Sequence, residues 1–164
     1  MRSKSKVVWV GFDARWYNRS GVGTYVAELL NALAPLQGDF RLLVYESPGN
    51  PVPGLANVER IPLAAGKYSP LGQIALWRRS RKDQLDVFHS PFYPVPVLAS
   101  CPVVVTVHDL IPFLFDGSNR LKRPLVKAGY RLAVQKARGI ICTSHQTASD
   151  VRRLLGVADD RIKV

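Results

Sequence analysis

The chain has 164 residues, of which 47% are hydrophobic and 21% charged, a balance typical of one globular domain and not of a disordered chain. Its 23 basic and 12 acidic residues leave a net charge of +11, which indicates an anionic partner such as a phosphorylated substrate, an acidic membrane or a nucleic acid. No apolar run is long enough to cross a membrane, and the run that begins at Val7 lacks the cleavage site of a secretory signal, so we expect a cytoplasmic protein.

Apolar runs and turn signals divide the first half of the chain into strands and helices. The predicted elements, in order, are a buried strand at 7–12, a polar loop at 13–20, a helix from Val22 to about Pro35, and strands at 40–45 and 58–63. Ser69 and Pro70 then indicate a helix start, because serine caps a helix and proline suits its first turn. We expect this helix to run toward Arg79.

The second half continues the alternation. Its predicted elements are strands at 85–89, 102–107, 139–143 and 162–164, a helix with Pro124 in its first turn, and a helix that Ser144 caps and Gly156 ends. Such alternation predicts an α/β fold, a Rossmann-like parallel sheet with helices on both faces.

Ligands of such sheets lie beyond the carboxyl ends of the strands. Four candidate places follow: the loop through Gly21 and Gly23, His89-Ser90, His108-Asp109, and Thr143-Ser144.

Gly21-Val22-Gly23 begins like a dinucleotide fingerprint, but Val26 stands where the third glycine belongs, and no Gly-Lys-Ser/Thr makes it a P-loop. Two interpretations remain open. The backbone amides of this segment could hold a phosphate or sugar oxygen at a helix N-terminus, or the segment is a plain turn and helix start.

His108-Asp109 is the sharper signal, since a histidine that leaves a buried strand can hydrogen-bond a sugar hydroxyl or accept a proton. The alternative is a structural histidine bonded to a carbonyl. His89 ends another strand, and there we favour packing against the proline-rich loop at 91–96.

A metal site is not expected, because His89, His108 and His145 have no His or Cys partner at ligand spacing. Cys101 and Cys142 stand in or beside apolar runs, and we expect buried free thiols rather than a disulfide.

Positive charge is concentrated in two segments. Between Asp116 and Asp150 no acid occurs, but seven bases do: Arg120, Lys122, Arg123, Lys127, Arg131, Lys136 and Arg138. A second cluster, which includes Arg78 and Arg79, follows Trp77. These are either solvated helix faces or a contact with an anionic surface.

Four landmarks in order resemble glycosyltransferase family 4. Asp13 with Ser20 to Val26 looks like that family's first loop and helix, and Asp86 to Pro91 like its next landmark. Val104 to Pro112 resembles its most characteristic strand and loop, and Thr143 to Ile162 its closing helix and strand. His145 departs from the pattern, which often has an acid there.

The resemblance implies the N-terminal, acceptor-side half of a GT-B enzyme, a hexosyltransferase of polysaccharide biosynthesis that moves a sugar from a nucleotide-sugar with retention and without a metal cofactor. Mannose is our choice for the sugar, and a glycan or lipid-linked acceptor for its recipient. By position, His108 would hold the transferred sugar, Gly21, Gly23 and Ser20 the donor diphosphate, while Asp109, His89 and Ser144 are secondary, acceptor-side candidates.

The family's second, nucleotide-binding domain has no counterpart in residues 1–164, so we expect one acceptor-side domain that is inactive alone. The positive segments fit a peripheral position at the inner membrane face, with Trp77, Arg78, Arg79, Arg123, Lys127 and Arg131 on the lipid. The alternative function is a non-catalytic basic module that binds nucleotides or nucleic acid. We do not expect nucleic acid, because no recognised motif interleaves the bases with aromatic residues.

Overall fold

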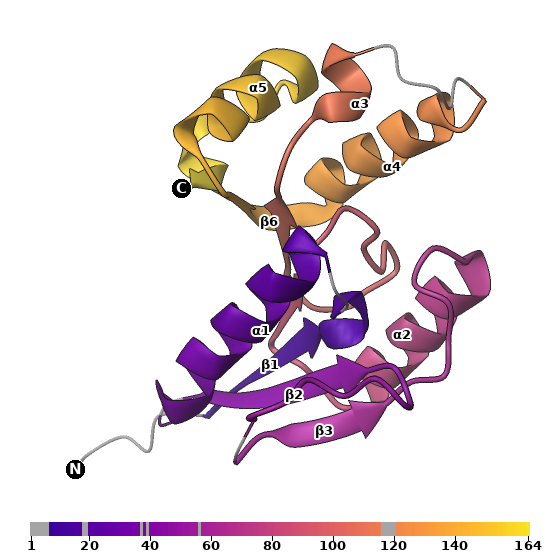
Figure 1. The fold of residues 1–164 in the computed structure, drawn as a ribbon, viewed down its shortest axis with the longest axis vertical. Coiled ribbons are helices and arrows are strands. Elements are labelled where there is room, and N and C mark those ends of the chain that lie inside the picture. Colours follow the sequence, from indigo (N-terminus) through magenta and orange to yellow (C-terminus); the bar gives the residue numbers. More distant parts are fainter. Residues whose placement is uncertain (1–6, 18–19, 37, 39, 56, 116–120) are drawn as a thin grey trace.

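A computed structural model of the chain describes residues 7–17, 20–36, 38, 40–55, 57–115 and 121–164. Seven strands form one sheet in the order β3-β2-β1-β4-β5-β6-β7, and every neighbouring pair is parallel (Figure 1). The strands are β1 (Val8–Asp13), β2 (Phe40–Glu46), β3 (Glu59–Pro62), β4 (Val87–Ser90), β5 (Val103–Val107), β6 (Ala137–Cys142) and β7 (Ile162–Lys163). The predicted α/β, Rossmann-like fold is confirmed.

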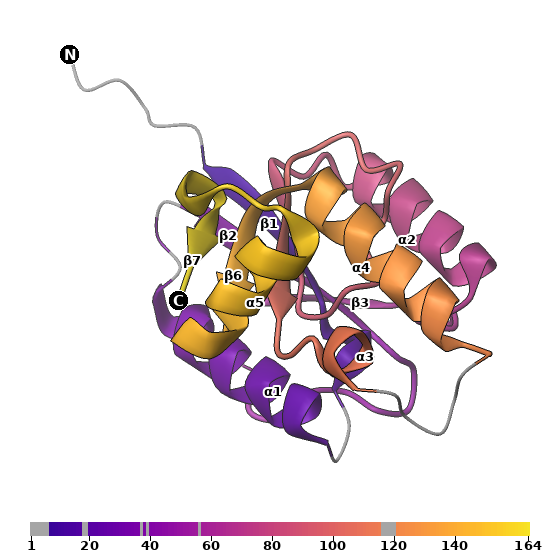
Figure 2. The same ribbon diagram turned by 90° about the horizontal axis from the view of Figure 1, so that it is seen from above.

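Helices cover both faces of this sheet. They are α1 (Gly21–Leu33), α2 (Pro70–Lys82), α3 (Ile111–Leu114), α4 (Arg123–Lys136) and α5 (His145–Leu155), with 3-10 turns η1 (Ala14–Trp16), η2 (Ala34–Leu36) and η3 (Asp159–Arg161). Side chains of α2, α4 and α5 join one buried cluster, whereas those of α1 join another. Figure 2 shows α2 and α4 on the side of the sheet away from α1.

The helix ends follow the sequence signals. Ser20, Ser69 and Ser144 each cap a helix with the side-chain oxygen, and α5 ends at Gly156 in the left-handed conformation with φ of 66°. Cys101 and Cys142 are buried free thiols, as expected. Among the described residues, none of the helices is long and apolar enough to cross a membrane.

Two expectations differ from the structure. The strand at 7–12 is only half buried, since Val8 and Trp9 remain 39% and 36% exposed at its amino end, where pairing with β4 begins only at Val10. The segment 13–20 is not simply a polar loop. Asp13 belongs to β1, and η1 is buried throughout its length. Residues 18–19 of this segment, and Arg120 of the basic run, lie outside the described residues.

A buried ion pair explains how this charged segment enters the core. The Asp13 carboxylate accepts from Nε and Nη2 of Arg15 at 2.7 and 2.8 Å, and both side chains are fully buried. Nη1 of Arg15 donates to the carbonyls of Ala65 and Gly72 at 3.2 and 3.4 Å. The pair therefore joins the end of β1 to the segment that opens α2, and its charges are compensated by hydrogen bonds.

Removal of one charge from this pair should unfold the domain more readily. We expect Asp13→Asn to lower the free energy of unfolding by about 3–5 kcal/mol, because Arg15 is then buried without its counter-charge. Urea titration followed by circular dichroism measures this. Asp159→Asn, which breaks the exposed pair with Arg152, is the control and should change the midpoint little. Equal effects of the two substitutions would show that burial of the Asp13 pair does not matter.

Candidate functional site

The order of the strands reverses between β1 and β4, which are neighbours although β2 and β3 lie between them in sequence. In open parallel sheets, ligands bind beyond the carboxyl ends of the strands at such a reversal. The segments that follow β1, β4 and β5 therefore surround the candidate site. They carry the glycine segment of α1, the loop from Pro91, and His108.

His108 follows β5 directly and is half-buried. Its Nε2 lies 2.8 Å from the carbonyl oxygen of Pro91. Because a carbonyl oxygen only accepts, Nε2 must carry a proton and donate, and in the neutral form of the ring Nδ1 is then the acceptor nitrogen. No partner of Nδ1 is found in the described part of the chain, and this nitrogen is the one that a ligand hydroxyl could approach.

Two hydroxyl groups hold the backbone of His108. Thr143 Oγ1 and Thr147 Oγ1 donate to its carbonyl oxygen at 3.0 and 3.1 Å. The Ser144 hydroxyl caps α5 by accepting from the Thr147 amide at 3.0 Å. The hydroxyl oxygens of Ser144 and Thr147 also lie 3.0 Å apart. Ser144 thus supports the strand end that carries His108 and acts on it through Thr147.

The glycine segment forms the first turn of α1 rather than a loop before it. Ser20 is the N-cap, and its Oγ accepts from the amide of Gly23 at 3.4 Å. The amides of Gly21 and Val22 have no partner within a helix at this position. A Cβ on Gly21 would meet nothing within 4 Å, so a side chain there is compatible with the fold. The plain helix start and an anion contact therefore both remain consistent with the geometry.

His89 lies below the surface, 8% exposed, with its ring edge-on to Phe12. Its Nε2 lies 2.9 Å from Thr106 Oγ1, which in turn lies 2.9 Å from the hydroxyl of Tyr25. Burial lowers the pKa of His89 to about 4, so the ring is neutral at physiological pH. His89 is thus a packed side chain, and the contacts that hold it are with Phe12 and Thr106.

Asp109 accepts from the amide of Ile111 at 3.0 Å and so shapes the start of α3. It also lies near Tyr130, whose pKa is raised by burial first and by the Asp109 charge second. The Asp109 carboxylate therefore has a structural role, since it binds the backbone next to His108.

The sequence profile of Glycosyltransferase Family 4 matches residues 19–164. The chain belongs to this family. No curated protein sequence matches the chain.

Solved structures agree with the family 4 assignment at the level of the fold. A glycosyltransferase from Rickettsia africae ESF-5 superposes with a TM-score of 0.63 and 13% identity, over 96% of this chain and 42% of its own. A sucrose-phosphate synthase from Thermosynechococcus elongatus gives 0.57 and 15%, over 90% of this chain and 82% of its own. The family 4 chain thus spans less than half the length of the Rickettsia africae protein.

The residues predicted to face an anionic surface lie on α2 and α4, on the same side of the sheet (Figure 2). On α2, Arg79 pairs with Asp83 at 2.8 Å, Arg78 is exposed and Trp77 is half-buried. On α4, Lys127 and Arg131 lie over the ring of Phe113, at 5.2 and 5.6 Å from its centroid. The Arg123 side chain donates to the Pro112 carbonyl at 2.7 Å.

An apolar row accompanies these bases on α4. Leu121, just before the helix, and Leu125 and Leu132 on it are 95%, 76% and 53% exposed. Their spacing is that of one helix face, opposite the buried Tyr130 and Ala133. Sequence analysis did not predict an exposed leucine row here.

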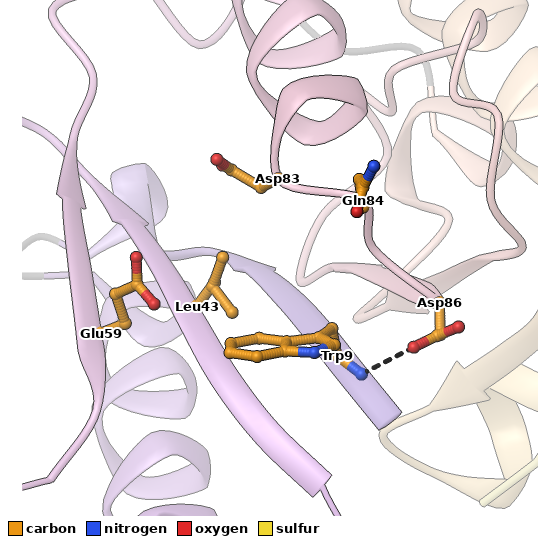
Figure 3. Close-up of a pocket in the computed structure, with 6 residues that line it drawn as sticks. All are labelled: Trp9, Leu43, Glu59, Asp83, Gln84 and Asp86. Carbon is orange, nitrogen blue, oxygen red and sulfur yellow. Dashed lines mark hydrogen bonds between the residues drawn. The ribbon is translucent and has the colours of Figure 1, made fainter. Parts of the chain in front are cut away.

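A pocket of about 400 Å³ lies elsewhere in the domain, at the amino ends of β1 and β4 (Figure 3). Two of its three acidic groups already have hydrogen-bond partners, since Asp83 accepts from the Tyr45 hydroxyl at 2.7 Å and Asp86 from the Trp9 amide at 2.9 Å, and the third is Glu59. The ends of the strands that carry ligands in parallel sheets are the opposite ones. We therefore place the site at His108 and not in this pocket.

Sequence reasoning missed three contributors to the site: Tyr25, Thr106 and the carbonyl of Pro91. Thr106 lies two residues before His108 at the end of β5, and in a strand this spacing places two side chains on the same face of the sheet. The spacing could therefore have indicated that Thr106 lies beside the site. Tyr25 and the Pro91 carbonyl give no such signal, because both approach His108 from segments distant in sequence.

The buried His89 should make the domain sensitive to acid. In the unfolded chain His89 takes up a proton near its ordinary pKa of about 6.5, whereas in the folded chain it does so only near 4. The free energy of unfolding should therefore fall as the pH drops from about 6.5 to about 4, by about 3 kcal/mol from this group.

Chemical denaturation at several pH values, with His89→Gln as the comparison, measures this contribution. The glutamine variant cannot titrate, so the difference between the two curves isolates His89. Parallel curves across this range would contradict the assignment.

Proposed function

We propose that the chain is the acceptor-side N-terminal domain of a retaining glycosyltransferase that moves a hexose from a nucleotide-sugar to a glycan or lipid-linked acceptor. We choose mannose as the transferred sugar and polysaccharide biosynthesis as the class of pathway. The nucleotide-sugar is a co-substrate, no metal is required, and a second domain binds the nucleotide. Residues 1–164 alone are then inactive.

The observation that supports this proposal best is the imidazole of His108 at the strand reversal. Its Nε2 is committed to the Pro91 carbonyl, which leaves Nδ1 to accept a hydrogen bond from a sugar hydroxyl. A group held in one orientation can stabilise charge that develops in the transition state without reorganising first. We assign this role to His108, beside the transferred sugar.

We assign the donor diphosphate to the first turn of α1, at Ser20, Gly21 and Gly23. The amides of Gly21 and Val22, which have no acceptor within the helix, and the positive end of the helix dipole attract phosphate there, while the Gly23 amide bonds Ser20 Oγ. Two observations favour this place: Gly21 leaves open space above its backbone, and Tyr25, one turn further along α1, contacts His108. A diphosphate at Gly21 would then lie on the same side as the reacting sugar.

Substitutions at both positions test the proposal in the complete enzyme. His108→Ala should lower kcat about 10²–10³-fold, because it removes a contact at the reacting sugar. Gly21→Ala should raise the donor KM about tenfold, since a methyl group then blocks the close approach of phosphate. Steady-state transfer of a radiolabelled sugar measures both.

Gly38→Ala is the matched control, because a Cβ on Gly38 also meets nothing within 4 Å while this residue lies beyond the other end of α1. It should leave both constants unchanged, and neither glycine variant should alter thermal unfolding. Full transfer by His108→Ala would refute the role of His108, and equal kinetics of the two glycine variants would refute the phosphate position.

We further infer a peripheral position on the inner face of an anionic membrane. Trp77, Arg78 and Arg79 on α2 and Arg123, Lys127 and Arg131 on α4 supply the positive charge. The exposed row Leu121, Leu125 and Leu132 supports this orientation, because it offers apolar side chains for insertion between flanking bases. Each basic residue near such a surface contributes about 1 kcal/mol, and less at high salt.

Vesicle binding tests this placement. The chain should sediment with vesicles that contain phosphatidylserine, less so as salt rises, and Leu125→Gln with Leu132→Gln should weaken binding at least tenfold at constant charge (about 1.4 kcal/mol). Leu36→Gln is the control, since Leu36 is 66% exposed at the far end of α1. Binding that ignores both lipid charge and the α4 leucines would contradict the placement.

A further inference from the structure

We infer that Tyr25 is a positioning residue, which anchors its hydroxyl on Thr106 and holds the imidazole of His108 in one orientation with its ring. The inference rests on the function proposed above for His108. Its structural part, that Tyr25 fixes the ring of His108, can be measured without any transfer reaction.

Tyr25 connects helix α1 to strand β5, although β1, the strand before α1, is not a neighbour of β5 in the sheet. It lies in the second turn of α1, which follows β1, whereas Thr106 lies on β5 and β4 separates these strands. The Tyr25 hydroxyl lies 2.9 Å from Thr106 Oγ1. The Tyr25 side chain thus connects α1, which begins with the glycine segment, to β5, which His108 follows.

The anchor is buried and carries no net charge. Thr106 is fully buried, and its hydroxyl can serve both Tyr25 and His89 because it offers one proton and two lone pairs. Burial raises the pKa of Tyr25, against the opposite effect of its bond to Thr106, and lowers that of His89. Both rings therefore stay neutral at physiological pH, and the anchor is not broken by titration in that range.

The ring of Tyr25 supplies the second restraint on His108. The two rings meet edge to face, with centroids 4.9 Å apart and planes at 86°. The bond from Nε2 to the Pro91 carbonyl fixes one ring atom, but the imidazole could still swing about that contact. Tyr25 restricts this swing, and the direction of Nδ1 is then determined. A displacement of about 1 Å at a reacting centre can cost up to about 10²-fold in rate.

The first experiment uses the 164-residue chain and imidazole nitrogen NMR. In the wild type, His108 should show a single tautomer with the proton on Nε2. Tyr25→Phe removes only the hydroxyl and should shift the His89 signals and move those of His108 toward a mixture of tautomers. Tyr25→Leu also removes the ring and should change His108 further.

Tyr45→Phe is the matched control, because Tyr45 is also buried and its hydroxyl also makes a hydrogen bond, to Asp83 on the C-terminal side of α2. It should leave the signals of both histidines unchanged. Wild-type His108 signals in Tyr25→Phe and Tyr25→Leu alike would overturn the inference.

The second experiment measures transfer by the complete enzyme. Tyr25→Phe should lower kcat about tenfold while the donor KM stays within about twofold, the pattern of a lost transition-state contact. If His108→Ala is inactive but both Tyr25 variants keep the wild-type kcat, the positioning role is refuted while the proposed function stands. If His108→Ala is fully active, the role proposed for His108 is refuted first, and with it the catalytic meaning of Tyr25.

Discussion

The reversal of strand order between β1 and β4 is the constraint on which the candidate site depends. Parallel hydrogen bonding requires each strand to begin at the same edge of the sheet, so the segments after β1, β4 and β5 all emerge at the opposite edge. The chain moves toward β2 from β1 and toward β5 from β4. The loops consequently diverge at this point and leave room between them for a ligand.

Polar side chains stabilise this edge by hydrogen bonds that avoid exposed charge. The buried Asp13–Arg15 pair fixes the end of β1, and neutral hydroxyl and imidazole groups connect β4, β5 and α1. A buried polar group is costly unless it is paired, so each of these contacts favours one arrangement of the loops. His108 is held within that arrangement at its carbonyl group and at Nε2.

The outer surface of α4 differs from this edge, because it carries exposed apolar side chains. Its buried face packs against the sheet through Tyr130, Ala133 and Val134, while the leucines are exposed and Lys127 and Arg131 lie over the ring of Phe113. An isolated globular domain gains nothing from exposed leucines in a row. This arrangement of exposed leucines and bases fits a helix whose outer face meets a second, less polar surface. We propose that this surface is a lipid bilayer.

The sequence by itself determined the order and type of nearly all strands and helices and the caps at Ser69 and Ser144, because apolar periodicity and capping residues act over a few positions, and its four landmarks indicated the family. It also placed His108 at a strand end. Only the tertiary structure decided that η1 is buried, that the α4 leucines are exposed, and that Tyr25 and the Pro91 carbonyl restrain the His108 ring. The physical reason is that the contacts of His108 with the Pro91 carbonyl and with Tyr25 join segments 17 and 83 residues apart, and local patterns carry no information about which distant groups meet.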